Sequence, residues 1–134
     1  MRLAVLLALP VLAACATTPP ATTATPLIGP EWRLEDLLGG GIIDRSHVTL
    51  TLAGDGRASG SAGCNGYFGS WSQAADGKLA LGKMGATMKA CAPSLMEQEG
   101  KYLRALETAS AYSFTADGAL VLDTAEGPLK FRKD

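Results

Sequence analysis

Length, composition and charge exclude several functional classes. The chain has 134 residues, with 12 Lys and Arg against 13 Asp and Glu, and a formal net charge of −1 at pH 7. This balance excludes the basic surface of a nucleic-acid binder and a polybasic patch for membrane attachment. The sequence has three cysteines and one histidine, His47. With Cys15 set aside as an acylation site, as argued next, two thiolates and one distant histidine fall short of a four-ligand metal set, so we expect neither a metal nor another cofactor.

The N-terminus has the features of an export signal. The apolar stretch Leu3–Leu12 is shorter than the roughly 20 residues that span a bilayer, but it fits the apolar region of a secretory signal peptide. The following Leu-Ala-Ala-Cys resembles the bacterial lipobox, which implies cleavage after residues 1–14 and acylation of Cys15. Ala16 then favours the outer membrane, facing the periplasm, by analogy with bacterial sorting rules. A buried core helix and secretion without a lipid are the alternatives.

A low-complexity segment follows the proposed lipidation site. Residues 15–26 are almost entirely Thr, Ala and Pro, without charge, and cannot bury enough surface to offset their ordering entropy. We interpret them as an extended tether of about 30 Å, at about 3.1 Å per residue. The folded domain is expected over residues 27–134, a length sufficient for one hydrophobic core.

Alternating apolar and polar residues predict the first strands over residues 32–37 and 48–52. The central stretch 56–71 is predicted to be a hairpin, with its turn at Gly63–Gly66. Small residues on the first strand of this hairpin leave room for the rings of Tyr67 and Trp71 on the second.

The second half of the domain is predicted to contain one helix and several short strands. A strand is expected at 78–81, and 84–91 is ambiguous between strand and loop. A helix is predicted over 94–109, with Ser94 and Glu97 forming a capping box. Its buried face is expected to contain Leu95, Glu99, Tyr102, Leu103, Leu106 and Ala109.

Three further strands, at 112–115, 120–122 and 129–131, are separated by Asp-Gly and Glu-Gly turns and predict a meander. The predicted fold class is therefore α+β, with a curved, barrel-like antiparallel β-sheet and one main α-helix packed on it.

The remaining two cysteines form a natural pair. If Cys15 is acylated, Cys64 and Cys91 are left in an oxidising compartment, and we expect a disulfide between them. Closing a loop of about 28 residues would stabilise the fold by roughly 3–4 kcal/mol. The alternative is two buried thiols that never meet.

No catalytic constellation is apparent in the sequence. The candidate triad partners of His47 are its sequence neighbours, which rarely reach the required geometry. A nucleophilic Cys64 lacks an evident base, and the carboxylates of Glu97 and Glu99 lie on different helix faces. We therefore expect a protein that is not an enzyme.

Two motifs carry a family resemblance. The pattern Gly63-Cys64-Asn65-x-Tyr67-x-Gly69-x-Trp71, followed by Thr87-x-x-Ala90-Cys91 and Glu99, resembles the META domain of HslJ-like proteins over Trp32–Arg132. The resemblance implies no catalytic residues. It implies structural roles for Gly63, Asn65, Tyr67, Gly69, Trp71 and Thr87, beside the two cysteines.

The resemblance also implies a bacterial envelope protein, often a lipoprotein, associated with heat-shock or antibiotic stress. We therefore expect a non-enzymatic, stress-related binding or envelope-maintenance module, held at the membrane by its lipid. Its partner would be an envelope protein or peptide. The alternatives are a thiol/disulfide redox factor using Cys64 and Cys91, and a small periplasmic protease inhibitor.

Overall fold

A computed structural model describes residues 10, 11, 13, 15 and 27–134. Apart from those first four residues, the predicted signal peptide (1–14) and tether (15–26) lie outside the described residues. Within the described part of the chain, no helix is long and apolar enough to cross a membrane.

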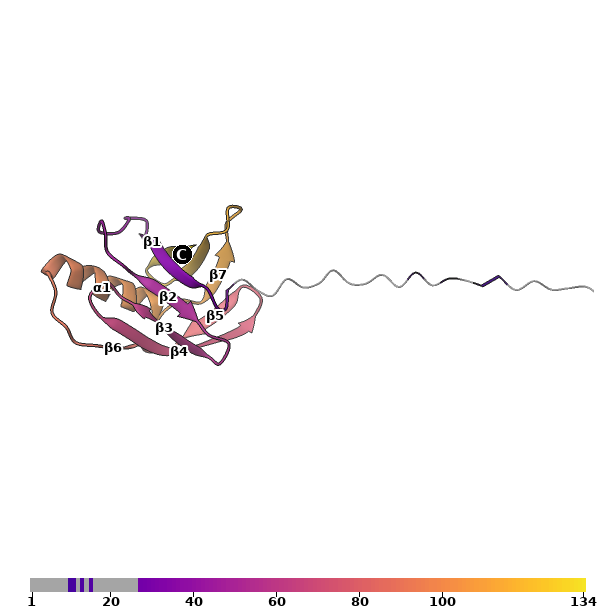
Figure 1. The fold of residues 1–134 in the computed structure, drawn as a ribbon, viewed down its shortest axis with the longest axis horizontal. Helices are drawn as coiled ribbons and strands as arrows, with labels where there is room; N and C mark the ends of the chain where they lie inside the picture. The colour runs from indigo at the N-terminus through magenta and orange to yellow at the C-terminus, as the bar shows by residue number, and fades with distance from the viewer. Residues whose placement is uncertain (1–9, 12, 14, 16–26) are drawn as a thin grey trace, which may run out of the picture.

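The described strands form a closed antiparallel barrel (Figure 1). The order around the barrel is β3-β2-β1-β9-β8-β7-β5-β4, and β4 pairs back with β3 to close a ring of eight strands. A two-residue strand, β6, adds to β4 outside this ring. The strands are β1 (Glu31–Leu37), β2 (Thr49–Leu52), β3 (Arg57–Ser61), β4 (Gly66–Ala75), β5 (Lys78–Leu81), β6 (Gly85–Ala86), β7 (Ala111–Phe114), β8 (Leu120–Thr124) and β9 (Gly127–Lys133).

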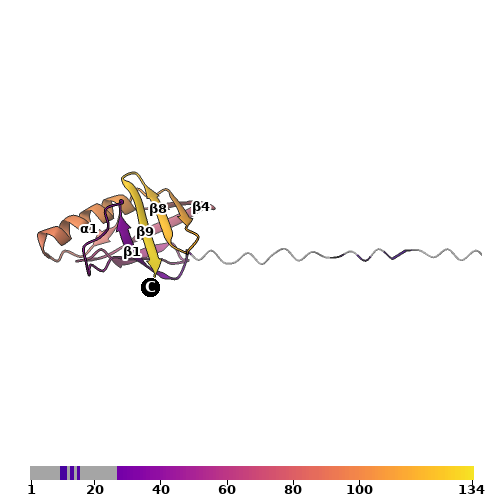
Figure 2. The same cartoon turned by 90° about the horizontal axis from the view of Figure 1, so that it is seen from above.

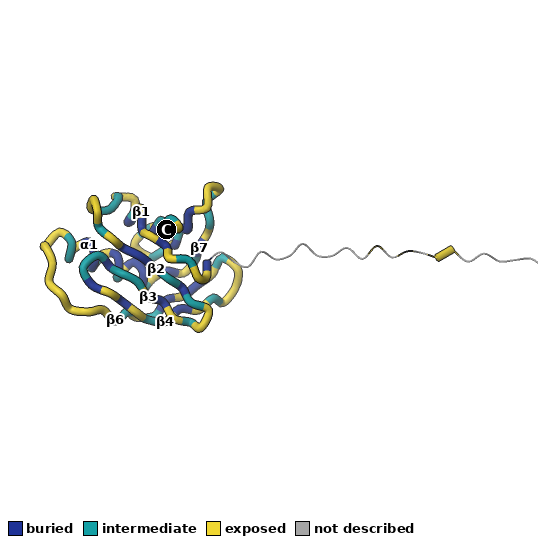
Figure 3. Tube along the Cα trace, in the orientation of Figure 1, coloured by how far each residue is buried: buried dark blue, intermediate teal, exposed yellow. Residues whose placement is uncertain are grey.

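The two-residue periodicity of the strands places apolar side chains in one continuous core. Buried and exposed residues alternate along β1 and β5, and in Figure 3 the buried residues lie along the strands while most turns are exposed. The largest fully buried side chains are Trp32, Tyr102, Phe131, Leu27, Leu34, Leu50, Leu52, Leu106, Leu120, Leu122, Leu129 and Val48. The predicted α+β fold, with a barrel-like sheet and one packed helix, is confirmed.

Most predicted strands lie close to their expected positions. The hairpin of β3 and β4 pairs Ser61 with Gly66 and Gly60 with Tyr67, and β7, β8 and β9 form the expected meander. The ambiguous segment 84–91 contains only β6 as regular structure, followed by an exposed connection to the helix (Figure 3).

The predicted helix boundaries and capping box are wrong. Helix α1 covers Pro93–Leu106, its N-cap is Ala92, and no side chain makes a capping hydrogen bond. The proline ring has the backbone angle of a first helical residue and lacks an N–H that would need a partner, so the helix begins at Pro93. Ser94 therefore lies inside the first turn and is exposed. Both views place α1 beside the barrel rather than within it (Figures 1 and 2).

The buried face of α1 differs from the predicted one in part. Tyr102, Leu106 and Glu99 are buried as expected, while Leu95 and Leu103 are only partly buried. Gln98, which the periodicity did not include, is buried with 6% of its surface exposed.

Candidate functional site

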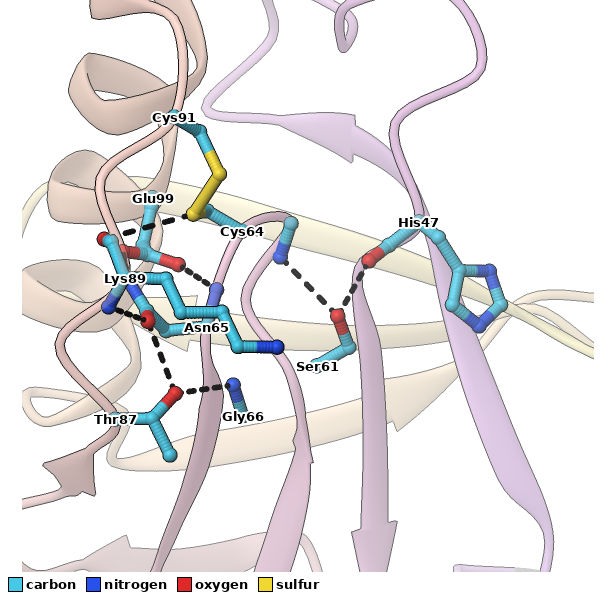
Figure 4. The surroundings of a disulfide bond; sticks show 10 residues. His47, Ser61, Cys64, Asn65, Gly66, Thr87, Lys89, Cys91 and Glu99 are labelled. Atoms are coloured by element: carbon cyan, nitrogen blue, oxygen red, sulfur yellow. Dashed lines mark hydrogen bonds between the residues drawn. A yellow bond between two sulfur atoms is a disulfide. The ribbon is translucent and has the colours of Figure 1, made fainter.

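The structure contains the predicted disulfide between Cys64 and Cys91, whose Cα atoms lie 6.0 Å apart. It joins the β3–β4 turn to the exposed segment that precedes α1 (Figure 4). Cys64 is partly buried and Cys91 is exposed. The bond therefore fastens a segment of little regular structure to the barrel.

Asn65 reinforces this attachment beneath the disulfide. Its side chain is 2% exposed, and its Oδ1 accepts hydrogen bonds from Thr87 Oγ1 at 2.9 Å and from the Lys89 backbone N–H at 2.6 Å. Its Nδ2 donates to the Lys89 carbonyl oxygen at 3.2 Å (Figure 4). Thr87 Oγ1 in turn accepts from the Gly66 backbone N–H at 3.2 Å. The two polar residues thus bind backbone groups that regular structure leaves free.

Glu99 completes this network from α1. Glu99 is 5% exposed, and its carboxylate accepts from the Asn65 backbone N–H at 2.6 Å and from Asn65 Nδ2 at 2.8 Å. Hydrogen bonds to a carboxylate are stronger than those between neutral groups. Both oxygens are engaged by one residue, so the carboxylate positions the β3–β4 turn against α1.

Two buried tyrosines continue the contact between α1 and the barrel. The hydroxyl oxygens of Tyr67 and Tyr102 lie 2.7 Å apart, and Tyr67 donates to the Thr49 carbonyl oxygen at 2.6 Å. Burial raises the pKa of both phenols above the ordinary value, so both stay neutral. Tyr67 Oη also borders Gly60, where an added Cβ would lie 3.0 Å from it and would clash with the Thr49 carbonyl. Small residues do make room for this ring.

The other predicted motif residues serve close packing. Trp71 is 8% exposed, and its ring nitrogen donates to the Ala53 carbonyl oxygen at 2.8 Å. A Cβ on Gly69 would lie 2.5 Å from the sulfur of Met84. Gly63 has a φ of +114°, a conformation that glycine adopts without strain. These contacts serve packing and turn geometry within the fold.

A groove of about 570 Å³ lies between the β1–β2 loop (residues 38–48) and α1. We call it the loop–helix groove. Its loop side is lined by the aliphatic side chains of Leu37, Leu38, Ile42 and Ile43, and Gln98 contributes from α1. Ile43 is 39% exposed. This volume is within the range of small-ligand sites.

The loop side of the groove is fixed by hydrogen bonds to two side chains. Asp36 accepts from the Gly39 and Gly41 backbone N–H groups, each at 2.8 Å. Gln98 Oε1 accepts from the Ile43 backbone N–H at 2.7 Å, which ties the loop to α1. Gly39 and Gly41 have positive φ angles, which glycine permits at this tight bend. The groove is therefore preformed.

The side-chain amide nitrogen of Gln98 differs from the other polar groups described at this loop, which form hydrogen bonds. Gln98 Nε2 is buried and has no hydrogen-bond partner within the described residues. Nothing local in the sequence marks Gln98, because its role depends on a loop 55 positions away in the chain.

The exposed side of the groove carries charges of both signs. Lys101 Nζ lies 3.3 Å from Glu97 Oε1, one helical turn apart, and both residues line the groove beside Ser94. This pair leaves the groove without an excess of either charge.

A sequence model of the META domain matches residues 25–134, a range that includes both cysteines and all of α1. The chain belongs to the META domain family. Membership supports a domain associated with the cell envelope, and neither the family nor the similar structures indicate an enzymatic family.

Two solved structures share the barrel of this META domain. An NMR structure of a protein from Burkholderia xenovorans is 28% identical, covers 88% of this chain and 98% of its own, and has a TM-score of 0.63. A second NMR structure is 24% identical, covers 78% of this chain and 88% of its own, and has a TM-score of 0.62; it supports the fold alone. A search of curated proteins gave no match.

The residues considered for catalysis are not assembled in this META domain. The side chain of His47 is 60% exposed, with Nε2 4.0 Å from Glu31 Oε1. Across the described residues, no group of three or more His, Cys, Asp or Glu side chains is placed to hold a metal ion. Cys15 is exposed and outside the disulfide, and its lipidation stays a prediction. The feature that the described residues do form is the loop–helix groove, with its aliphatic walls and its hydrogen-bonded loop.

Proposed function

We propose that this META domain is a non-enzymatic binding module of the bacterial envelope, tethered to the outer membrane by a lipid on Cys15. It faces the periplasm and serves a stress-related or envelope-maintenance role by binding an envelope protein or peptide. The observation that carries the binding role is the preformed loop–helix groove, with its aliphatic walls and its loop held to α1 by Gln98.

The position of the groove supports this role. Its walls come from the β1–β2 loop and α1, two elements held by hydrogen bonds to the rest of the domain. A site on such a fixed scaffold loses little conformational entropy when a partner binds. The large aliphatic side chain of Ile43 is partly exposed there, which suits contact with an apolar group of a partner.

Site-specific photo-crosslinking in living cells tests the binding role. A photoreactive residue replaces Ile43 in the groove, and a matched one replaces Phe68, which is 62% exposed on β4. We expect a discrete crosslinked product from position 43 that is absent at position 68. The same products from both positions, or none from position 43, would contradict a binding role for the groove.

Cell fractionation tests the anchor separately. Cys15→Ala is expected to move the protein from the membrane fraction to the soluble periplasmic fraction, because acyl chains supply about 0.8 kcal/mol per buried CH₂. Cys91→Ala is the matched control and keeps the cysteine at position 15. A Cys15→Ala protein that stays with the outer membrane would rule out the lipid as its anchor.

A further inference from the structure

The segment that begins at β6 has the geometry of a second interaction surface. We propose that two copies of this chain associate through residues 85–90, which form an antiparallel strand pair with its two-fold axis at Met88. This surface is not part of the proposed function, because none of these residues lines the loop–helix groove.

One side of the segment is bound to the barrel at every second residue. Gly85 lies in β6, which pairs with β4. The Thr87 backbone N–H donates to the Gly66 carbonyl oxygen at 3.0 Å. The Lys89 backbone N–H donates to Asn65 Oδ1 at 2.6 Å, and its carbonyl oxygen accepts from Asn65 Nδ2 at 3.2 Å. A period of two residues is that of a β-strand, so the segment continues β6 as an extended edge.

The other side of the segment presents free backbone groups. Because the hydrogen-bonding groups of successive residues in a strand point to opposite sides, those of Ala86, Met88 and Ala90 face away from β4. All three residues are exposed, and among the described residues the backbone groups of Met88 and Ala90 have no hydrogen-bond partner. Figure 4 shows Thr87 and Lys89 beyond β4, at the end of this side of the sheet. Such an edge is a template for another strand.

The free edge has a defined start and end. Before it, the Met84 N–H donates to Oε1 of Glu107, the C-cap residue of α1, at 2.9 Å. After it, Cys91 is fixed by the disulfide, and Pro93, which lacks an N–H, begins α1. Met88 is therefore the centre of the free edge.

The free edge is complementary to a second copy of itself. In an antiparallel pair centred on Met88, each Met88 would face its mate, and Ala86 would face Ala90 of the second copy. Every outward N–H would then meet an outward carbonyl oxygen. Thr87 would face Lys89 of the second copy, so no like charges would lie directly opposite each other.

The side chains at the edge also favour this pairing. Met88 is 97% exposed, and at the two-fold axis the two apolar side chains would bury each other. A lysine on an edge strand commonly prevents association with another strand. In Figure 4, however, the Lys89 side chain extends over the β3–β4 turn toward Ser61, away from the free edge.

The dimer would be weak in solution, because a strand pair of this length buries less than the roughly 1,600 Å² of a standard interface. The membrane anchor of the proposed function would confine the copies to one surface and raise their effective concentration. We therefore expect a dimer that forms with rising concentration rather than a permanent one.

Sedimentation velocity of the full chain carrying Cys15→Ala measures this association. The dimer fraction is expected to rise with protein concentration. Met88→Glu would place like charges at the two-fold axis and remove the apolar contact, so the dissociation constant is expected to rise at least about tenfold. Ser72→Glu is the matched control: it adds the same charge at an exposed position of β4 opposite β5, and is expected to dimerise as the parent does.

Cysteine substitutions test the register in the same Cys15→Ala chain. Met88→Cys would place two Cα atoms about 5.5 Å apart across the axis, within the range of a disulfide. Ala86→Cys would separate them by four residues, or about 14 Å along the strands, which is out of reach. Oxidised glutathione is therefore expected to link the Met88→Cys chain into a dimer, visible on a non-reducing gel, and to leave the Ala86→Cys chain unlinked.

Several results would overturn the proposal. These are a chain that stays monomeric at every concentration, equal association of Met88→Glu and the parent, and equal linking from positions 86 and 88. In cells, a Met88→Cys chain linked only to a different protein would replace the second copy by a foreign strand. None of these results changes the crosslink at position 43, which tests the groove alone.

Discussion

Replacing Glu99 by Gln tests whether the buried carboxylate holds α1 to the barrel. The two carboxylate oxygens accept from the backbone N–H and the side-chain amide of Asn65, at 2.6 and 2.8 Å (Figure 4). A glutamine presents one oxygen and one NH₂ group, so one of the two donors of Asn65 would face another donor. Hydrogen bonds to charged groups contribute about 1.5–3 kcal/mol, and a buried donor left unpaired adds a desolvation penalty. We expect Glu99→Gln to lower the free energy of unfolding by about 3 kcal/mol.

Urea denaturation followed by circular dichroism measures this change, and the melting temperature should fall by roughly 13 °C for a domain of this size. Glu97→Gln is the matched control on the same helix. The side chain of Glu97 is 70% exposed and pairs with Lys101 one helical turn away, so a loss below about 0.5 kcal/mol is expected. If both variants unfold at the same urea concentration as the parent, the buried network does not stabilise the contact between α1 and the barrel.

Three further predictions concern stability. Cys91→Ser opens the disulfide and is expected to cost about 3–4 kcal/mol in urea denaturation under non-reducing conditions; equal stability would contradict the stabilising role. Hydrogen bonds from a neighbouring threonine hydroxyl and an arginine guanidinium lower the pKa of Asp117 to about 2, from an ordinary value of 3.8. Its stabilisation is therefore complete above pH 4 and lost as the pH falls toward 2, and Asp117→Asn should flatten this part of the acid-unfolding curve. Gly60→Ala is expected to lower the free energy of unfolding by about 3 kcal/mol or more, because its methyl group would clash with the backbone of β2. Gly66→Ala is the control and should fold normally, since the nearest neighbour of its added Cβ lies at 3.8 Å. Thermal melts of both variants test this difference.

Local patterns were sufficient to predict most of the barrel. The alternation along residues 48–52 and the turns between the last three strands are properties of neighbouring residues, and the structure follows them. The disulfide between Cys64 and Cys91 was also predictable, because the prediction used only the number of cysteines and the expected oxidising compartment. Closure of the ring between β3 and β4 follows directly from the predicted central hairpin.

Features that depend on contacts between distant segments could not be predicted in the same way. The capping box at Ser94 failed because Pro93 begins the helix one residue earlier, a competition between two valid local signals. Glu99 was recognised as the polar member of an apolar helix face, but the partner that explains its burial is Asn65, 34 positions away in the chain. Gln98 carried no signal at all, since only the folded β1–β2 loop supplies the N–H that fixes its amide.

Adjacent residues of α1 connect the family motif to the groove. Glu99 accepts hydrogen bonds from Asn65 in the β3–β4 turn, and Gln98 accepts one from Ile43 in the β1–β2 loop. Two successive acceptors thus attach one helical turn to two different loops of the barrel. Because the Gln98 side chain starts from the same backbone that Glu99 fixes, the motif around Asn65 determines where one wall of the groove lies. The motif residues thus position α1 and, through it, the side of the groove that Gln98 lines.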